Sequence, residues 1–267
     1  MRHIRTVACV IAVHAFFVAS AGYVFADDRE GALISAATSG DAKKVAWLVG
    51  EDVNINCRGQ NDTTPLIEAA KNGQEAVVKY LLSHYVSVNL DDKDDVSPLM
   101  YAARGGYAAV TADLLMSGAN VKAQDVRGYT ALLYAAENSH IDTAKLLLEK
   151  GSDPNQRCLT TDTALTLAIQ KKDAEMVQLL LSKGADPNTK LTEGTFGGRH
   201  GDRGGLDGIT ALMRAVQAGS IEITQMLLDK GAKVNEVTSM SNTALSYAVA
   251  GGHKEIADLL ISKGAKQ

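Results

Sequence analysis

Aromatic residues and strong net charge are both scarce in this chain. Only 5% of its 267 residues are aromatic, and the formal net charge is −4 at pH 7. So mild a charge argues against a general nucleic-acid surface, which would need a basic stripe. The apolar residues are mostly Ala, Leu and Val. Small side chains of this kind suit thin helices that stack closely.

Motifs for catalysis and metal binding are also missing. The histidines are scattered, and neither Cys57 nor Cys158 has an adjacent histidine that would activate it as a nucleophile. No pair of Cys or His residues has the spacing of metal ligands. The acidic run at residues 91–95 lacks the alternating oxygen ligands and the glycine of an EF-hand loop, so we interpret it as a solvated loop tip. We therefore predict no enzyme activity, no cofactor and no metal.

The N-terminus has the layout of a secretory signal peptide. A short basic region at residues 2–5 precedes an apolar run over about residues 7–18, and small residues follow. We predict a signal peptide over residues 1–26 with cleavage after Ala26, and cleavage after Ala21 is the alternative. A membrane anchor is disfavoured because the run is short for a span of roughly 20 residues. The sequence thus predicts a periplasmic or secreted protein without stable membrane insertion after cleavage.

A leucine recurs at a fixed spacing along the rest of the chain. The gaps between successive copies are 33, 33, 33, 33, 47 and 33 residues, so one unit occurs seven times with a single insertion. Such an array folds as one continuous domain, here residues 27–267. The seven anchor leucines are Leu33, Leu66, Leu99, Leu132, Leu165, Leu212 and Leu245.

Each unit carries signals for two short helices. A Thr or Ser two residues before the anchor leucine can cap the first helix, and Pro65 and Pro98 fit its first turn. Small residues follow the leucine, then a Gly or polar break, then a second helix with apolar residues at helical spacing. A glycine suited to a left-handed cap usually ends the second helix. Asp52 and Tyr85 occupy that position instead, where a left-handed backbone would strain Tyr85 more than Asp52.

This pattern resembles the ankyrin repeat over about residues 31–267. The resemblance implies an all-α repeat solenoid of seven helix pairs, with loops that project at right angles as β-turn fingers. It also implies a curved array with the fingers and first helices on the concave side. The histidine that the family often carries after the leucine is absent throughout. The matching residues include Thr64-Pro65-Leu66 with Ala69-Ala70, Gly73 and Leu81-Leu82, and Gly231-Ala232-Lys233-Val234-Asn235 in the sixth unit.

The repeat spacing predicts that the two cysteines of the mature chain do not pair with each other. Cys57 and Cys158 lie three repeats apart. At roughly 10 Å per helix layer, their separation exceeds the ~7 Å limit for the Cα atoms of a disulfide. We predict two free thiols, with intermolecular pairing as the alternative.

The resemblance implies that a partner binds on the concave side, at positions just before the anchor leucine and five or six residues after it. Arg127 and Tyr129 are the best candidate anchors, because Arg and aromatic side chains are the usual hot-spot types. The other predicted contact residues on this scaffold are Lys71, Arg104, Glu137, Gln170, Lys171, Leu206, Ile209 and Gln217.

The insertion before the sixth anchor covers about residues 191–207 and is rich in glycine. It belongs at a finger tip, where extra length need not disturb the stack. It is either a tolerated flexible loop, a partner-contacting finger or an anion site, although no P-loop lysine and serine follow it. A binding role would use Phe196, Arg199, His200 and Arg203.

Together these features predict a non-enzymatic, monomeric scaffold that is exported to a bacterial periplasm and binds a protein through its concave face. The prediction includes no nucleic-acid partner. Two alternatives remain open at this point. One is a secreted effector that binds host proteins. The other is an accessory protein of a periplasmic redox or metal enzyme, in which the long loop or the cysteines take part.

Overall fold

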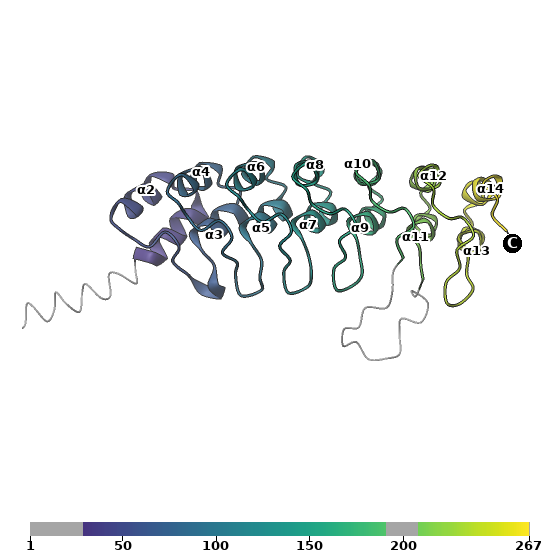
Figure 1. Cartoon of the computed structure of the whole chain (residues 1–267), viewed down its shortest axis with the longest axis horizontal. Coiled ribbons are helices and arrows are strands. Elements are labelled where there is room, and N and C mark those ends of the chain that lie inside the picture. Colours follow the sequence, from purple (N-terminus) through teal and green to yellow (C-terminus); the bar gives the residue numbers. More distant parts are fainter. Residues whose placement is uncertain (1–28, 191–207, 267) are drawn as a thin grey trace, which may run out of the picture.

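The computed structural model describes residues 29–190 and 208–266 of the chain. Two layers of helices run along the molecule, and a row of finger loops projects from one of them (Figure 1). The row of outer helices arches gently, and the finger loops lie inside the curve. The predicted signal peptide and the insertion at 191–207 fall outside the described residues.

The first helix of each unit lies in the inner layer, beside the fingers. From α3 onwards, the predicted Thr or Ser caps each of these helices, and its side-chain oxygen accepts a bond of 3.1–3.3 Å from the backbone N–H three residues later. Pro65 and Pro98 occupy the first turn, as predicted. The inner helices are residues 29–39, α3 (Pro65–Lys71), α5 (Pro98–Gly105), α7 (Ala131–Glu137), α9 (Ala164–Lys171), α11 (Ala211–Gln217) and α13 (Ala244–Ala250).

The second helices form the outer layer, and each packs on the inner helix of its own unit. Asp52 and Tyr85 both adopt the left-handed conformation after α2 and α4, with φ of 60° and 58°. The Tyr85 side chain gains nothing from burial there, since the residue is 96% exposed. The outer helices are α2 (Ala42–Gly50), α4 (Glu75–Ser83), α6 (Ala108–Met116), α8 (Ile141–Glu149), α10 (Ala174–Ser182), α12 (Ile221–Asp229) and α14 (Lys254–Ser262).

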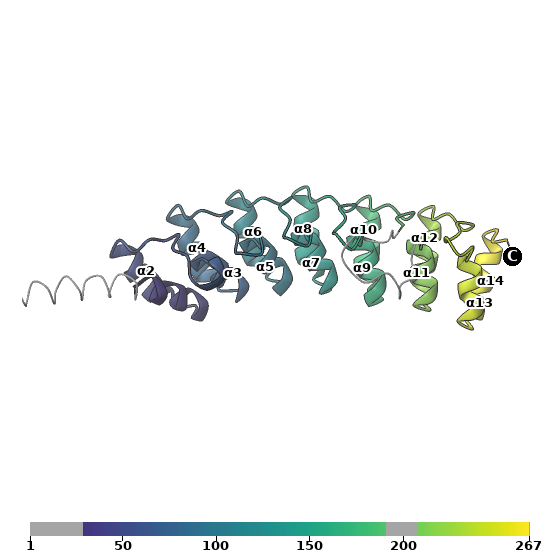
Figure 2. The same ribbon diagram turned by 90° about the horizontal axis from the view of Figure 1, so that it is seen from below.

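Stacking of like helices builds the core. From α3 to α13 each inner helix contacts the next inner helix, and from α2 to α14 each outer helix contacts the next outer one. Figure 2 shows this succession of helix pairs from below. The anchor leucines are buried in every unit, and so are the alanines three residues after them. Burial of one leucine side chain contributes about 1.5–3 kcal/mol, so every unit depends on its neighbours for stability.

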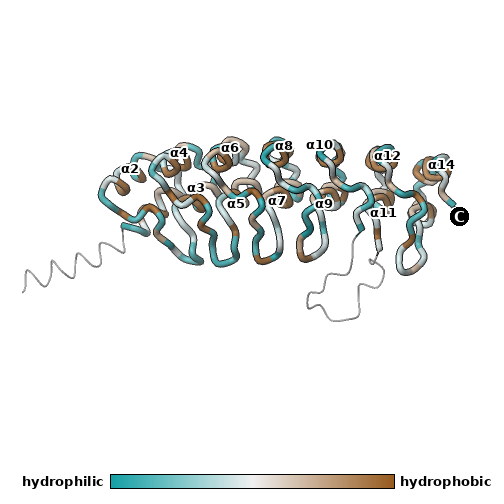
Figure 3. The backbone as a smooth tube through the Cα atoms, viewed as in Figure 1, coloured by the Kyte–Doolittle hydropathy of each residue, from teal (hydrophilic) through white to brown (hydrophobic). Residues whose placement is uncertain are grey.

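Backbone hydrogen bonds connect the fingers to one another. The N–H groups of Lys93, Val126 and Leu159 donate to carbonyl oxygens of the preceding finger, over 3.1, 3.1 and 2.9 Å. The described fingers contain no strand. One contains the short 3-10 helix η1 (Gln60–Asp62), and Lys190 forms an isolated antiparallel bridge with Thr210. Figure 3 shows that hydrophobic residues recur in every helix pair, whereas much of the finger row is hydrophilic.

The break between the two helices of a unit fits against a side chain of the next unit. Gly106 follows α5 with a φ of +71°, and a Cβ atom at this position would lie only 2.4 Å from Nδ1 of His140. The His140 ring is held there because Nε2 lies 3.1 Å from the carbonyl oxygen of Arg104. Gly106 is therefore required both by its backbone conformation and by the ring beside it. His140 therefore has a structural role at the start of α8.

At the positions equivalent to Gly106 and His140, two later units have a larger residue at the break and a smaller one in the next unit. Ser139 and Lys172 replace the glycine there, and they keep a positive φ of 59° and 58°. The residues at the position equivalent to His140 in the following units are the smaller Asp173 and Ser220. A side chain at the break thus occurs where the neighbouring unit offers a small residue.

We expect this size match to be measurable in a double-mutant cycle. Gly106→Ser should lower the free energy of unfolding by at least about 2 kcal/mol, because it combines left-handed strain with overpacking against His140. Adding His140→Asp, which reproduces the Ser139 and Asp173 pair, should recover at least about 0.5 kcal/mol relative to additivity. Urea unfolding of the four proteins measures both quantities.

Gly118→Ser is the matched control. Gly118 also has a positive φ, of +87°, but nothing lies within 4 Å of its potential Cβ position. Serine there reports the backbone cost alone. An additive cycle, with equal costs at Gly106 and Gly118, would contradict the packing explanation.

Candidate interaction surface on the inner face

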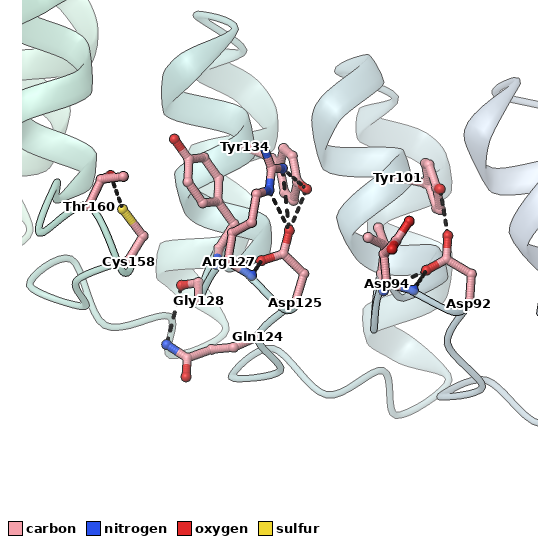
Figure 4. Close-up of polar contacts among 12 residues, drawn as sticks. Asp92, Asp94, Tyr101, Gln124, Asp125, Arg127, Gly128, Tyr134, Cys158 and Thr160 are labelled. Carbon is pink, nitrogen blue, oxygen red and sulfur yellow. Dashed lines mark hydrogen bonds and ion pairs between the residues drawn. The ribbon is translucent and has the colours of Figure 1, made fainter. Parts of the chain in front are cut away.

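The inner face of the fourth unit is organised around the buried carboxylate of Asp125. One carboxylate oxygen, Oδ1, accepts the backbone N–H groups of Arg127 and Tyr129, both over 2.8 Å. The other, Oδ2, accepts the Tyr134 hydroxyl over 2.7 Å and lies 3.4 Å from Nη2 of Arg127 (Figure 4). The Asp125 side chain is only 1% exposed, so its charge is fully committed to these partners. Charge-assisted bonds of this kind fix the base of the finger.

Arg127 is held in place by this carboxylate and by two aromatic rings. Its guanidinium carbon lies 4.7 Å from the ring centre of Tyr129 and 5.6 Å from that of Tyr134. Nη2 also donates to the Tyr134 hydroxyl over 2.5 Å. The side chain is nevertheless 57% exposed. Arg127 therefore presents a pre-positioned guanidinium to solvent, which is the arrangement expected of an interface anchor.

Tyr134 receives a second cation from the third unit. The Arg104 guanidinium carbon lies 5.8 Å from the ring centre of Tyr134, which is fully buried. Burial, together with the hydrogen bond to Asp125, raises the pKa of the Tyr134 hydroxyl to about 12. The hydroxyl therefore stays protonated at neutral pH and can donate to the carboxylate.

The third unit repeats the arrangement one period earlier. Asp92 Oδ1 accepts the N–H groups of Asp94 and Val96, both over 3.0 Å, and Oδ2 accepts the Tyr101 hydroxyl over 2.7 Å. Lys71 of the second unit lies over Tyr101, with Nζ 5.5 Å from the ring centre. In both units a cationic side chain at the end of one inner helix thus lies over the tyrosine ring of the next inner helix. The cation–π attraction holds each charged group against the surface.

The fifth unit uses different chemistry. Cys158 occupies the position equivalent to Asp125, and its Sγ lies 3.0 Å from the Thr160 hydroxyl (Figure 4). Asp162 takes over the role of acceptor, with bonds from Thr166 and Gln170 of 3.1 and 3.2 Å. The aspartate–tyrosine arrangement is therefore specific to the third and fourth units of the described chain.

Most of the predicted contact residues lie on the inner face. Glu137 is half-buried, and six others are exposed: Lys71, Arg104, Arg127, Gln170, Lys171 and Gln217. Phe196, Arg199, His200, Arg203 and Leu206 lie outside the described residues, so their predicted contact role remains a prediction.

Two predicted surface residues are buried, which corrects the sequence interpretation. Tyr129 is 8% exposed and Ile209 is 1% exposed. Both stand three residues before the anchor leucine, a position that turns inward at the base of the finger. In the fourth unit the cause is visible, because the Tyr129 N–H is tied to Asp125 and its ring packs 5.2 Å from that of Tyr134. Tyr129 supports Arg127 and does not offer its own ring to a partner.

The acidic run at residues 91–95 also needs a correction. Asp92 is only 7% exposed and binds backbone and Tyr101, so the run is not uniformly solvated. The sequence interpretation missed this role, and it missed Asp125, Tyr101 and Tyr134 as well. The signal was present, because Asp92 and Asp125 are one period apart, and so are the two tyrosines.

The cysteines are free, as predicted, and both are buried. Burial and the nearby charge of Glu30 raise the pKa of the Cys57 thiol to about 11, which leaves it protonated and unreactive at neutral pH. Within residues 29–190 and 208–266, no group of three or more His, Cys, Asp or Glu side chains is placed to hold a metal ion. No helix of that same part is long and apolar enough to cross a membrane.

Comparisons with known proteins agree with this architecture. A family model described as ankyrin repeats (3 copies) matches residues 33–125, 111–190 and 196–267. Among solved structures, the crystal structure of the human ASB11 ankyrin repeat domain matches with a TM-score of 0.71 and 23% sequence identity. The match covers 88% of this chain and 98% of that one, and it shows a shared fold. No curated protein matches the chain.

We expect the Tyr134 hydroxyl to stabilise the array. Tyr134→Phe should lower the free energy of unfolding by about 1.5–3 kcal/mol, because it removes a buried hydrogen bond to a charged acceptor. The loss should shrink as the pH rises from about 10 to 12. Above pH 10 the unfolded chain releases the phenolic proton that the folded protein retains, so the advantage of a raised pKa is lost.

Tyr247→Phe is the control for this measurement. Tyr247 occupies the same repeat position in the last unit, and its hydroxyl has no partner among the described residues. Its replacement should change the unfolding free energy by less than about 0.5 kcal/mol. Equal losses for Tyr134→Phe and Tyr247→Phe, or a loss at Tyr134 that is constant from pH 8 to 12, would count against the proposed role.

Proposed function

The chain belongs to the ankyrin repeat family, and we propose that it is an exported scaffold that binds a protein partner through its concave inner face. Ankyrin repeats generally mediate protein–protein interactions, and the family match extends from residue 33 to the end of the chain. The exposed side chains determine which partner binds, because the fold itself is shared by proteins with different functions.

The pre-positioned inner face is the observation that supports this proposal. Arg127 is exposed yet fixed by Asp125, Tyr129 and Tyr134, so binding need not order a flexible side chain. Immobilising a long side chain otherwise costs about 0.5–1.5 kcal/mol on association. The exposed concave residues also extend from α3 to α11, which suits an extended protein surface better than a small molecule.

The location of the binding surface can be tested with photo-crosslinking residues. A crosslinker at Gln170 or Gln217, both exposed on the inner layer, should form a discrete adduct with the partner in cells of the native source. A crosslinker at Lys145 or Glu222, both exposed on the outer layer, should not form this adduct. Mass spectrometry of the adducts identifies the partner.

The two pairs of positions control for each other. All four are exposed helical residues and none belongs to the buried core. Gln170 donates a side-chain hydrogen bond to Asp162, so Gln217 tests the inner layer without loss of that bond. Adducts of the same partner at equal yield from both layers, or from the outer layer alone, would reject the concave face as the binding surface.

Export is the second part of the proposal, and it rests on the basic and apolar pattern before residue 27. N-terminal sequencing of the protein recovered from its native source should give a chain that begins at Asp27. A start at Gly22 would select the alternative cleavage site. Recovery of the intact chain from Met1 in the cytoplasm would contradict export.

A further inference from the structure

Charge is distributed unevenly between the two helix layers. The outer helices from α2 to α14 carry nine acids and five lysines, in keeping with the net negative charge of the chain. The inner helices from α3 to α13 have the opposite balance. They carry four cations, Lys71, Arg104, Lys171 and Arg214, against two acids, Glu68 and Glu137. The inner helices of this acidic protein are thus cationic on balance, whereas the finger before α5 carries the exposed Asp94 and Asp95.

The cations of the second to fourth units differ in how far they are already neutralised. Nζ of Lys71 lies 3.9 Å from Oε1 of Glu68, and Arg127 is paired with the buried Asp125. Arg104 has no ion pair within the described residues, and Glu137 is the one acid of the next inner helix. The surface around Tyr134 therefore combines one uncompensated guanidinium, from Arg104, with one oriented guanidinium, from Arg127.

The orientation of Arg127 leaves donors for a ligand. Its Nε and Nη2 face Asp125 and Tyr134, whereas Nη1 has no partner among the described residues. The Asp125 carboxylate cannot turn outward to compete, because it already accepts two backbone N–H groups and a hydroxyl. The Nη1 group can therefore donate a charge-assisted hydrogen bond to a carboxylate of a ligand.

We propose that this surface binds side-chain carboxylates of an extended acidic segment in the partner. Its centre is formed by Arg104 of the third unit and Arg127 of the fourth unit, which both lie against Tyr134. The proposal rests on the function proposed above and adds the chemistry of the partner. Successive inner helices are roughly 10 Å apart, which is about one turn, or three residues, of an extended polyproline II chain. Acidic residues at every third position of such a chain lie on one side and would face successive units.

A peptide tests the proposal directly. The probe is an acetylated and amidated peptide of four Glu-Gly-Ser triplets with an uncharged fluorophore, and the matched probe carries Gln in place of Glu. Fluorescence anisotropy at low ionic strength should detect binding of the Glu peptide and none of the Gln peptide. Arg104→Gln and Arg127→Gln should each weaken binding by about fivefold, the effect expected for the loss of one exposed charge pair.

Lys145→Gln provides the matched control for net charge, since Lys145 is exposed on α8 in the outer layer of the same unit as Tyr134. Lys145→Gln should change the affinity for the Glu peptide by no more than about twofold. Arg104 makes no hydrogen bond through its side chain among the described residues, so Arg104→Gln should keep the wild-type melting temperature. If Arg127→Gln lowers the melting temperature, Arg127→Lys should keep the fold. It should still weaken binding, because a single ammonium group cannot bond to Asp125 and Tyr134 and also present a separately oriented donor such as Nη1.

Several outcomes would overturn the proposal. They are no binding of the Glu peptide, equal binding of the Gln peptide, an equal loss for Lys145→Gln and Arg104→Gln, or binding of polyphosphate in place of the Glu peptide. If one of these occurs while the Gln170 crosslink is formed, the inner face binds the partner and only the acidic specificity is wrong. If the Glu peptide binds as expected but crosslinks form only on the outer layer, the proposed function is wrong.

Discussion

Burial of the anchor leucine between neighbouring units is the constraint on which the rest of this structure depends. A pair of helices of seven to nine residues cannot bury that side chain alone, so each unit is stable only when stacked. The spacing is then fixed, because every inner helix must present its leucine and its alanines in the same register. A surface assembled on such a stack is rigid, since each inner helix between two others is held on both sides.

The sequence predicted this framework because its signals act locally and recur. The hydroxyl caps, Pro65 and Pro98, and the left-handed positions at Asp52 and Tyr85 each depend on a few neighbouring residues. The contact between Gly106 and His140 is different, because it joins residues 34 positions apart in two units. It could still have been inferred, since the size of one partner varies with that of the other through the array. Comparison of the units with one another carries information that no single unit contains.

The interaction surface was only partly predictable, and the misplacement of Tyr129 explains why. Position in the repeat gives the path of the backbone, but the direction of a side chain at the base of a finger depends on the hydrogen bonds below it. Asp125 draws the Tyr129 N–H inward, and the ring follows into contact with Tyr134. Ile209 is buried at the same position, so the error was systematic for apolar side chains there. Arg104 and Lys171, at the ends of inner helices, were correctly predicted to be exposed, because that end faces solvent in their units.

The buried aspartates connect stability with recognition. An unpaired carboxylate as deeply buried as Asp125 would be costly, and its bonds to the finger backbone and to Tyr134 remove that cost. The same bonds fix the direction of the Arg127 guanidinium and offset part of its charge. Arg104 makes no such pair and contributes attraction more than direction. A carboxylate that approaches Tyr134 would thus meet a net positive charge from one unit and an oriented donor from the next, and neither unit supplies both.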